Sequence, residues 1–168
     1  GQHPEGRFLP DTYFVPLSGK KSRILIDAAA AMDKALAEAW AGRDKALPLQ
    51  TAEQLLVLAS IVEKETGQAH ERPQIAGVFV RRLQANMRLQ TDPTVIYGLG
   101  PAFDGNLRRR DLETDTPYNT YTRAGLPPTP IALASQASLD AVVNPPRSDY
   151  LYFVARGDGS SQFSTNLS

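Results

Sequence analysis

Apolar residues recur every three or four positions over three stretches in the first half of the chain, the spacing of a helix with one buried face. The first stretch predicts a long helix with Ser22 as its N-cap and Gly42 at its end. The next two predict helices over about 51–66, capped by Thr51, and over about 71–85. We therefore expect a core built from packed helices.

The pattern changes in the second half. Residues 86–130 contain six prolines and four glycines, which predicts a long ordered loop with short helical pieces, and loops of that length commonly form the wall of a site. A short helix is expected over 135–143. A strand over 150–154 and a turn over 156–159 predict a C-terminal hairpin, and residues 7–15 predict a short edge strand. The fold class is therefore α+β, with strands near both termini.

Two glutamates near the end of the helix over 51–66 differ in the side they face. On a helical wheel Glu63 lies about 45° from the centre of the apolar face, whereas Glu65 lies well over 90° away. A carboxyl group in an apolar setting has a raised pKa and can act as a general acid near neutral pH. The structural alternative is a Glu63 that forms an ion pair with Arg81 or Arg82, or one whose side chain extends outward past small neighbours to solvent. The wheel leaves the catalytic and structural interpretations open.

Composition narrows the chemistry. Eighteen basic residues balance eighteen acidic ones, which gives no reason to expect a nucleic-acid partner. There is no cysteine, and the only histidines are His3 and His70, so neither a thiol nucleophile nor a metal centre is expected, and no cofactor is predicted. No apolar run reaches the roughly 18 residues that would span a bilayer.

Several motifs, in order along nearly the whole chain, resemble the YceG-like family of endolytic murein transglycosylases. The first is Glu63-Lys64-Glu65-Thr66 with the apolar residues before it. The other matching segments are 5–12, 88–98, 118–121, 125–128, 150–154 and 163–166. The resemblance implies one catalytic domain over 1–168 with a lysozyme-like helical core and the catalytic glutamate at the end of a buried helix.

In that family the first glutamate of the Glu-Lys-Glu-Thr motif is expected to be catalytic, which here is Glu63. The resemblance implies cleavage of the β-1,4 bond between N-acetylmuramic acid and N-acetylglucosamine of peptidoglycan, leaving a 1,6-anhydro end. That product requires one residue acting first as acid and then as base. The residues expected to bind the glycan are Gln90, Thr91, Asp92, Tyr118, Asn119, Thr120 and Tyr121.

Some of these residues also fit plain structural roles. Asp92 precedes Pro93 and suits a helix N-cap, and Asn119 suits bonding to loop backbone. The run Arg108-Arg109-Arg110 fits a solvated surface, although it could also meet peptide-stem carboxylates.

The resemblance also implies an N-terminal membrane anchor and a LysM-like segment outside this sequence, a location on the periplasmic face of the inner membrane, and cell-wall synthases as candidate partners. Two other functions stay open. One is a lysozyme-type hydrolase that uses Asp92 or Glu65 as a second carboxylate, and the other is a glycan-binding or scaffolding domain without catalysis.

Overall fold

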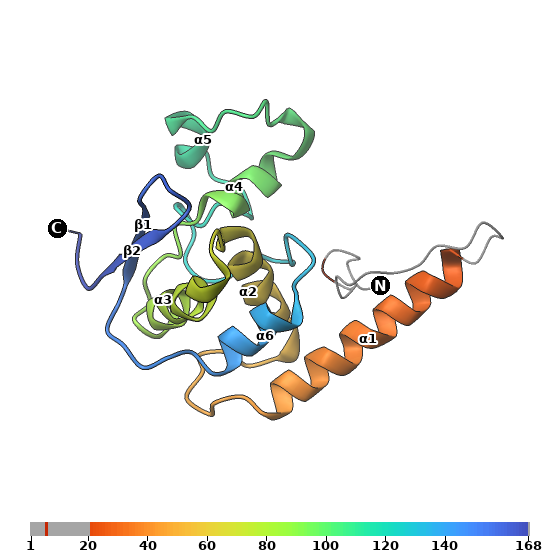
Figure 1. Ribbon diagram of the computed structural model, residues 1–168. Helices are drawn as coiled ribbons and strands as arrows, with labels where there is room; N and C mark the ends of the chain where they lie inside the picture. Colours follow the sequence, from red (N-terminus) through yellow and green to blue (C-terminus); the bar gives the residue numbers. More distant parts are fainter. Residues whose placement is uncertain (1–5, 7–20, 168) are drawn as a thin grey trace.

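The computed structural model describes Gly6 and residues 21–167, without the side chains of Lys21 and Ser22. Figure 1 shows a helical body, a small lobe above it and a β-hairpin at its edge. The described elements are α1 (Lys21–Ala41), α2 (Ala52–Glu65), η1 (Ala69–Glu71), α3 (Arg72–Gln84), α4 (Asp92–Leu99), η2 (Gly100–Ala102), α5 (Arg109–Glu113), α6 (Gln136–Val143), β1 (Tyr152–Ala155) and β2 (Ser161–Ser164).

Helix α2 is the central helix. All eight residues from Leu55 to Val62 are buried, because α1, α3, α4 and α6 pack around it. The largest fully buried side chains of the core are Met32, Leu55, Leu56, Leu58, Ile61, Ile75, Phe79, Leu89 and Leu139. A helix that is apolar nearly all round must lie inside the protein, and here that requirement places the C-terminal end of α2 among several other segments.

The boundaries predicted from the sequence are largely confirmed. Thr51 caps α2 by accepting a hydrogen bond from the backbone N–H of Gln54 at 3.2 Å, and α1 ends one residue before Gly42. Helix α1 begins at Lys21, so the prediction of Ser22 as its N-cap is wrong by one or two residues. A difference of this size is the usual uncertainty of helix ends. The strand expected over 7–15 lies outside the described residues.

The C-terminal hairpin is confirmed. Strands β1 and β2 pair antiparallel, with Phe153 opposite Phe163, and both rings pack on the helical core. The two-stranded sheet together with the helices supports the α+β class. Between α3 and α6 the chain forms the lobe that carries α4 and α5, so the proline-rich segment is ordered as expected (Figure 1).

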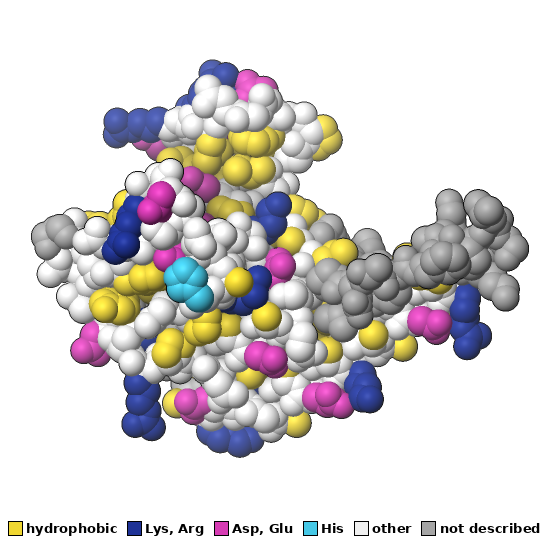
Figure 2. All heavy atoms as spheres, viewed as in Figure 1, with side chains coloured by type: hydrophobic (Ala, Val, Ile, Leu, Met, Phe, Trp, Pro, Cys, Tyr) yellow, Lys and Arg dark blue, Asp and Glu magenta, His cyan; other side chains and the backbone are white. Residues whose placement is uncertain are grey.

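The visible surface mixes charges of both signs, and basic side chains gather on the lobe at the top, over α5 (Figure 2). Within residues 21–167, no helix is both long and apolar enough to cross a bilayer.

Candidate active site

Glu65, the last residue of α2, faces a cavity of about 450 Å³, called here the Glu65 cavity. Five parts of the chain form its walls: the end of α2, α3, the segment that leads into α4 with the first residue of that helix, the loop between α5 and α6, and the hairpin. The residues that matter for its chemistry are Glu65, Arg82, Gln90, Asp92, Tyr121 and Phe153. A carboxyl group therefore lies in a concave site among polar groups and aromatic rings, as a saccharide-binding site requires.

The pKa of Glu65 is raised above its ordinary value of 4.5. Burial is the largest cause, because it removes water from the charged form, and the nearby negative charge of Asp92 acts in the same direction. The hydroxyl of Thr91 donates a hydrogen bond to Glu65 Oε1 at 2.5 Å and partly opposes these effects. Glu65 consequently keeps its proton to a higher pH than a solvated glutamate.

Glu63 has different surroundings. Its Oε2 accepts hydrogen bonds from the backbone N–H of Ser135 at 3.1 Å, from the Ser135 hydroxyl at 2.7 Å and from the Ser138 hydroxyl at 2.5 Å. Burial alone would raise the pKa of Glu63, but these bonds and the positive charge of Arg72 lower it below 4.5. Glu63 lines neither the Glu65 cavity nor the larger cavity beside it.

Two expectations from the helical wheel are therefore wrong. Glu63 does turn toward the interior, but its neighbours there are the hydroxyls at the start of α6, so the setting is polar and its pKa is lowered. Glu65 was expected to face solvent or the helix flank, yet it is partly buried and its pKa is raised. The wheel gives the angle of a side chain on its own helix, not the chemistry of the segments that pack there.

The alternative of an ion pair between Glu63 and Arg81 or Arg82 is not found among the described residues. Arg81 donates to the carbonyls of Tyr150, at 2.6 Å, and Pro146, at 3.3 Å. Arg82 likewise donates to backbone carbonyls, and neither guanidinium group has a recorded ion pair within the described residues. Both arginines hold the C-terminal segment on the helical body instead.

Three of the seven residues expected to bind glycan line the Glu65 cavity: Gln90, Asp92 and Tyr121. The hydroxyl of Tyr121 donates to Asp92 Oδ1 at 2.5 Å. Burial and this carboxylate raise the pKa of Tyr121, so the phenol stays protonated and can donate its hydrogen bond to Asp92. Gln90 has φ 51°, a left-handed conformation that is costly for a residue with a side chain and that is often found at functional sites.

The other four support the site from behind. Thr91 and Thr120 are about 2% exposed and bond to each other, the N–H of Thr91 donating to the Thr120 hydroxyl at 3.0 Å. Asn119, 1% exposed, donates to the carbonyl of Thr114 at 2.7 Å and accepts from the N–H of Tyr121 at 2.9 Å, so its loop-bonding interpretation is confirmed. Tyr118 bonds to Thr129 at 2.8 Å, away from the cavity.

The expected N-cap role of Asp92 is wrong by one residue. The cap position of α4 is Thr91, whose side chain makes no capping bond, and Asp92 is the first helical residue. A carboxylate in the first turn still favours the helix through its dipole. This shift leaves the Asp92 side chain free to reach Tyr121 across the cavity.

Sequence reasoning missed the residues that attach the hairpin. Glu71, only 7% exposed, accepts the backbone N–H of Ser161 with both carboxylate oxygens, at 2.9 and 3.1 Å. Next to it, a Cβ added to Gly67 would lie 2.8 Å from the carbonyl oxygen of Gly159, so only glycine allows the hairpin turn to approach so closely. No local pattern signals these contacts, because the partners are about 90 residues apart.

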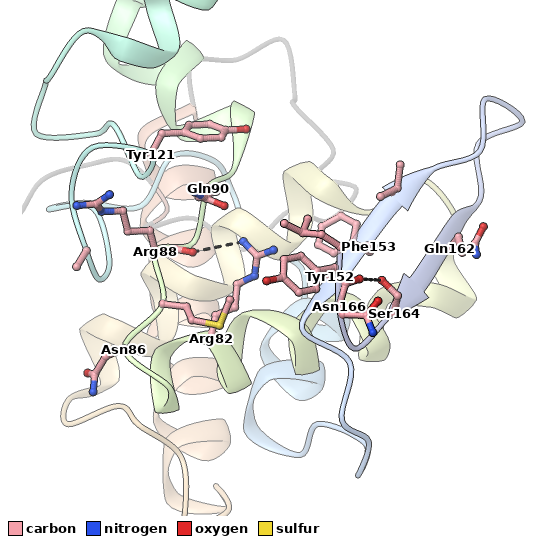
Figure 3. Close-up of a pocket in the computed structure, with 14 residues that line it drawn as sticks. Arg82, Asn86, Arg88, Gln90, Tyr121, Tyr152, Phe153, Gln162, Ser164 and Asn166 are labelled. Carbon is pink, nitrogen blue, oxygen red and sulfur yellow. Dashed lines mark hydrogen bonds between the residues drawn. The ribbon is translucent and has the colours of Figure 1, made fainter.

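A second cavity, of about 950 Å³, adjoins the first and shares Arg82, Gln90, Tyr121 and Phe153 with it. We call it the Arg88 cavity and the two together the groove. Figure 3 shows Arg82 at its centre, between the carbonyl of Arg88 and the ring of Tyr152. Among residues 6 and 21–167, no group of three or more side chains is arranged to hold a metal ion.

The fold and the site together define an α+β domain with an open groove and one carboxyl group whose pKa is raised, a class of site suited to acid–base chemistry on a polar, uncharged bond. The YceG-like family matches residues 2–168, so the chain belongs to that family.

Named relatives agree. The chain is 38% identical to an endolytic murein transglycosylase of Bacillus subtilis (strain 168), over 99% of this chain and 46% of that protein. It is 36% identical to one of Streptococcus pneumoniae serotype 2, over 90% of this chain and 28% of that protein. A crystal structure of a putative yceG-like protein from Listeria monocytogenes superposes with a TM-score of 0.82 at 39% identity, covering 96% of this chain and 52% of that one. The chain thus spans about half or less of these relatives.

Proposed function

We propose that this chain is the catalytic domain of an endolytic peptidoglycan lytic transglycosylase, and that Glu65 is its general acid and base. The relatives named as endolytic murein transglycosylases support the reaction class. The single observation that favours Glu65 is its place in the cavity with a raised pKa, because a general acid must be protonated and within reach of the substrate.

The reaction needs one such residue. Protonated Glu65 gives its proton to the glycosidic oxygen between N-acetylmuramic acid and N-acetylglucosamine as the bond from that oxygen to C1 breaks. The carboxylate then takes the proton of the muramic C6 hydroxyl while O6 bonds to C1. A 1,6-anhydro end and a free 4-hydroxyl result, no water is consumed, and Glu65 is protonated again.

The surrounding residues have separate tasks in this proposal. Thr91 orients the Glu65 carboxyl through its hydrogen bond, and the ionised Asp92 lies near the positive charge that develops on the sugar ring. Gln90 offers an amide to the N-acetyl groups, and the ring of Tyr121 offers a flat surface to a sugar.

Glu63, the glutamate that the family resemblance indicates, is the competing assignment for the acid. Its three hydrogen bonds stabilise the ionised form and occupy Oε2, which is the opposite of what an acid needs. We therefore assign Glu63 to holding the start of α6 against α2.

Product analysis tests the function. Uncrosslinked glycan strands are digested with the domain and with Glu65→Gln, and the ends are identified by mass spectrometry. Anhydro ends from the wild type and not from the variant are expected. Ends heavier by one water would instead support a lysozyme-type hydrolase, an alternative favoured by the presence of Asp92 in the same cavity.

Absence of cleavage by the wild type, in a longer protein that includes the segments found in the relatives, would contradict the enzymatic proposal and favour a binding role. We also propose, from the resemblance alone, that the full protein is anchored in the inner membrane, faces the periplasm and works with cell-wall synthases. Fractionation of cells with an antibody against the domain tests that location.

A further inference from the structure

The two cavities of the groove differ in their acidic residues, although Arg82 lines both of them. Both carboxylates, Glu65 and Asp92, line the Glu65 cavity, whereas the residues that line the Arg88 cavity include two arginines, Arg82 and Arg88, and no Asp or Glu. The Arg88 cavity therefore presents a positive field to whatever lies beyond the cleaved bond.

Arg82 provides a fixed part of this charge. It is 7% exposed and donates to the carbonyls of Leu151 at 2.7 Å, Leu89 at 2.8 Å and Arg88 at 3.3 Å. Carbonyl oxygens satisfy its hydrogen bonds without neutralising it, and its guanidinium lies 5.1 Å from the centre of the Tyr152 ring. A charge held by dipoles alone stays available to attract an anion.

Arg88 provides the accessible part. Its side chain is exposed and lines the edge of the cavity, extending in Figure 3 to the side away from Arg82, and no ion pair is recorded for it within the described part of the chain. Two arginines of the neighbouring basic run differ from it: Arg108 pairs with Asp104 at 2.8 Å and Arg109 with Glu113 at 2.9 Å. The expectation that this basic run meets peptide carboxylates therefore transfers better to Arg88.

We propose that the Arg88 cavity is a subsite for a free carboxylate carried by the glycan's muramic acid substituent, with Arg88 as its ion-pair partner and Arg82 as the fixed charge behind it. This rests on the proposed function, because a peptide stem or a free lactyl group is what gives the otherwise uncharged glycan its carboxylates. A chain of neutral sugars would leave the two arginines without a partner.

The subsite is tested by comparing native uncrosslinked strands with strands whose carboxyl groups have been converted to methylamides. The wild type is expected to show a kcat/KM about threefold to tenfold higher on native strands, the range for one partly exposed charge-assisted bond. In the Arg88→Gln variant, the preference for native strands should fall to less than about twofold. The loss should appear mainly as a higher KM for native strands, because the contact is remote from the reacting bond. Arg88→Lys should retain part of the preference.

Arg110→Gln is the matched control, since Arg110 is an exposed arginine of α5 that lines neither cavity, and it should keep the wild-type preference. Strands stripped by an amidase carry only the lactyl carboxylate and so distinguish its source: a retained Arg88 dependence identifies the lactyl group, and a lost one identifies the stem. An Arg88→Gln preference equal to that of the wild type, or a wild type without any preference, overturns the proposal.

A binding assay tests the proposed carboxylate subsite independently of the cleavage reaction. Glu65→Gln is incubated with native and methylamidated strands, with and without Arg88→Gln, and retention of the protein on the strands is measured. If the wild type made no anhydro ends, the proposed function would fail, while an Arg88-dependent preference for native strands in this assay would still support the carboxylate subsite. Equal retention on both kinds of strand would count against it.

Discussion

Two glutamates at the C-terminal end of α2 face different segments of the protein, and their pKa values are shifted in opposite directions. On the α6 side, three hydrogen-bond donors converge on one oxygen of Glu63 and lower its pKa. On the groove side, Glu65 has one donor, a buried position and a negative neighbour, and its pKa is raised. The two residues are separated by Lys64 alone, so the difference comes from the segments that pack on each side.

This difference teaches how one helix end can serve structure and chemistry at once. An ionised carboxylate whose hydrogen bonds are satisfied stabilises the fold. A desolvated carboxyl group near another negative charge does not stabilise the fold, but it can hold a proton for catalysis. The first arrangement ties α2 to α6. The second places Glu65 in the wall of the groove.

The largest expected difference is in reaction rate. Glu65→Gln removes the proposed proton carrier and should slow formation of anhydro ends by about 10²–10⁴-fold, whereas Glu63→Gln should retain activity within about tenfold of the wild type. Single-turnover digestion of uncrosslinked strands measures both. The reverse result, with Glu63→Gln inactive and Glu65→Gln active, would make Glu63 the acid.

Substitutions of two neighbours of Glu65, Thr91 and Asp92, should shift the pH dependence of activity in opposite directions. Because the protonated form acts first, activity is expected to fall as the pH rises through the pKa of Glu65. Thr91→Val removes a bond that lowers this pKa, so the alkaline limb of kcat/KM should move to higher pH. Asp92→Asn removes a charge that raises it, so the limb should move to lower pH.

Identical movement of the limb in both variants would show that Glu65 does not control it. A variant of a groove residue that makes no contact with Glu65, such as Gln162→Ala, serves as the control and should leave the limb in place.

Substitution of Glu63 and of Glu65 should change the free energy of unfolding in opposite directions. Glu63→Gln is expected to lower the free energy of unfolding at pH 7 by about 1 kcal/mol, since charge-assisted bonds to a partly exposed carboxylate are weakened. Glu65→Gln should raise it by about 0.5–1 kcal/mol, because a desolvated charge is removed. Urea unfolding at pH 7 and pH 4 measures both.

The pH window follows from the direction of each shift. The pKa of Glu63 is lower in the folded protein than its ordinary value of 4.5, so its contribution is present above that pH and is lost as the pH falls through the folded value. The pKa of Glu65 is higher in the folded protein, so its cost appears as the pH rises from 4.5 through the folded value. Both differences from the wild type should therefore shrink at pH 4, and a constant difference at both pH values would contradict the shifts.

The smallest effect concerns backbone strain in the groove. Gln90 has φ 51°, where glycine is favoured over alanine, so Gln90→Gly should be more stable than Gln90→Ala by about 0.5–1 kcal/mol. Both variants remove the side-chain amide and should cleave glycan more slowly. Thermal unfolding of the pair measures the difference, and equal midpoints would show that the local backbone relaxes.

Much of the architecture could be predicted from local patterns. The helices α2, α3 and α6 and the C-terminal hairpin lie where the periodicity, the cap at Thr51 and the turn residues indicate. These signals are local, because capping, periodic burial and tight turns depend on residues a few positions apart. The loop segment was also expected to form the wall of a site, and Gln90, Asp92 and Tyr121 bear that expectation out.

The roles of the site residues stay predictions, but their places in the structure can be compared with the sequence analysis. The helical wheel favoured Glu63 over Glu65, and four of the seven expected glycan contacts, Thr91, Tyr118, Asn119 and Thr120, support the loops without lining either cavity. In an irregular segment, the same polar side chains can bind a ligand or bond to the loop's own backbone. The residue type alone therefore cannot show whether a hydroxyl meets a sugar or a backbone carbonyl.

By itself, then, the sequence determined the helical core, the hairpin and a pair of glutamates at the end of a buried helix, because these depend on short-range periodicity and motif order. Only the tertiary structure decided which glutamate meets hydroxyl donors and which meets the groove. That choice is made by Ser135 and Ser138 on one side and by Thr91 and Asp92 on the other. They lie some 26 to 75 residues away along the chain, and a pKa depends on neighbours in space.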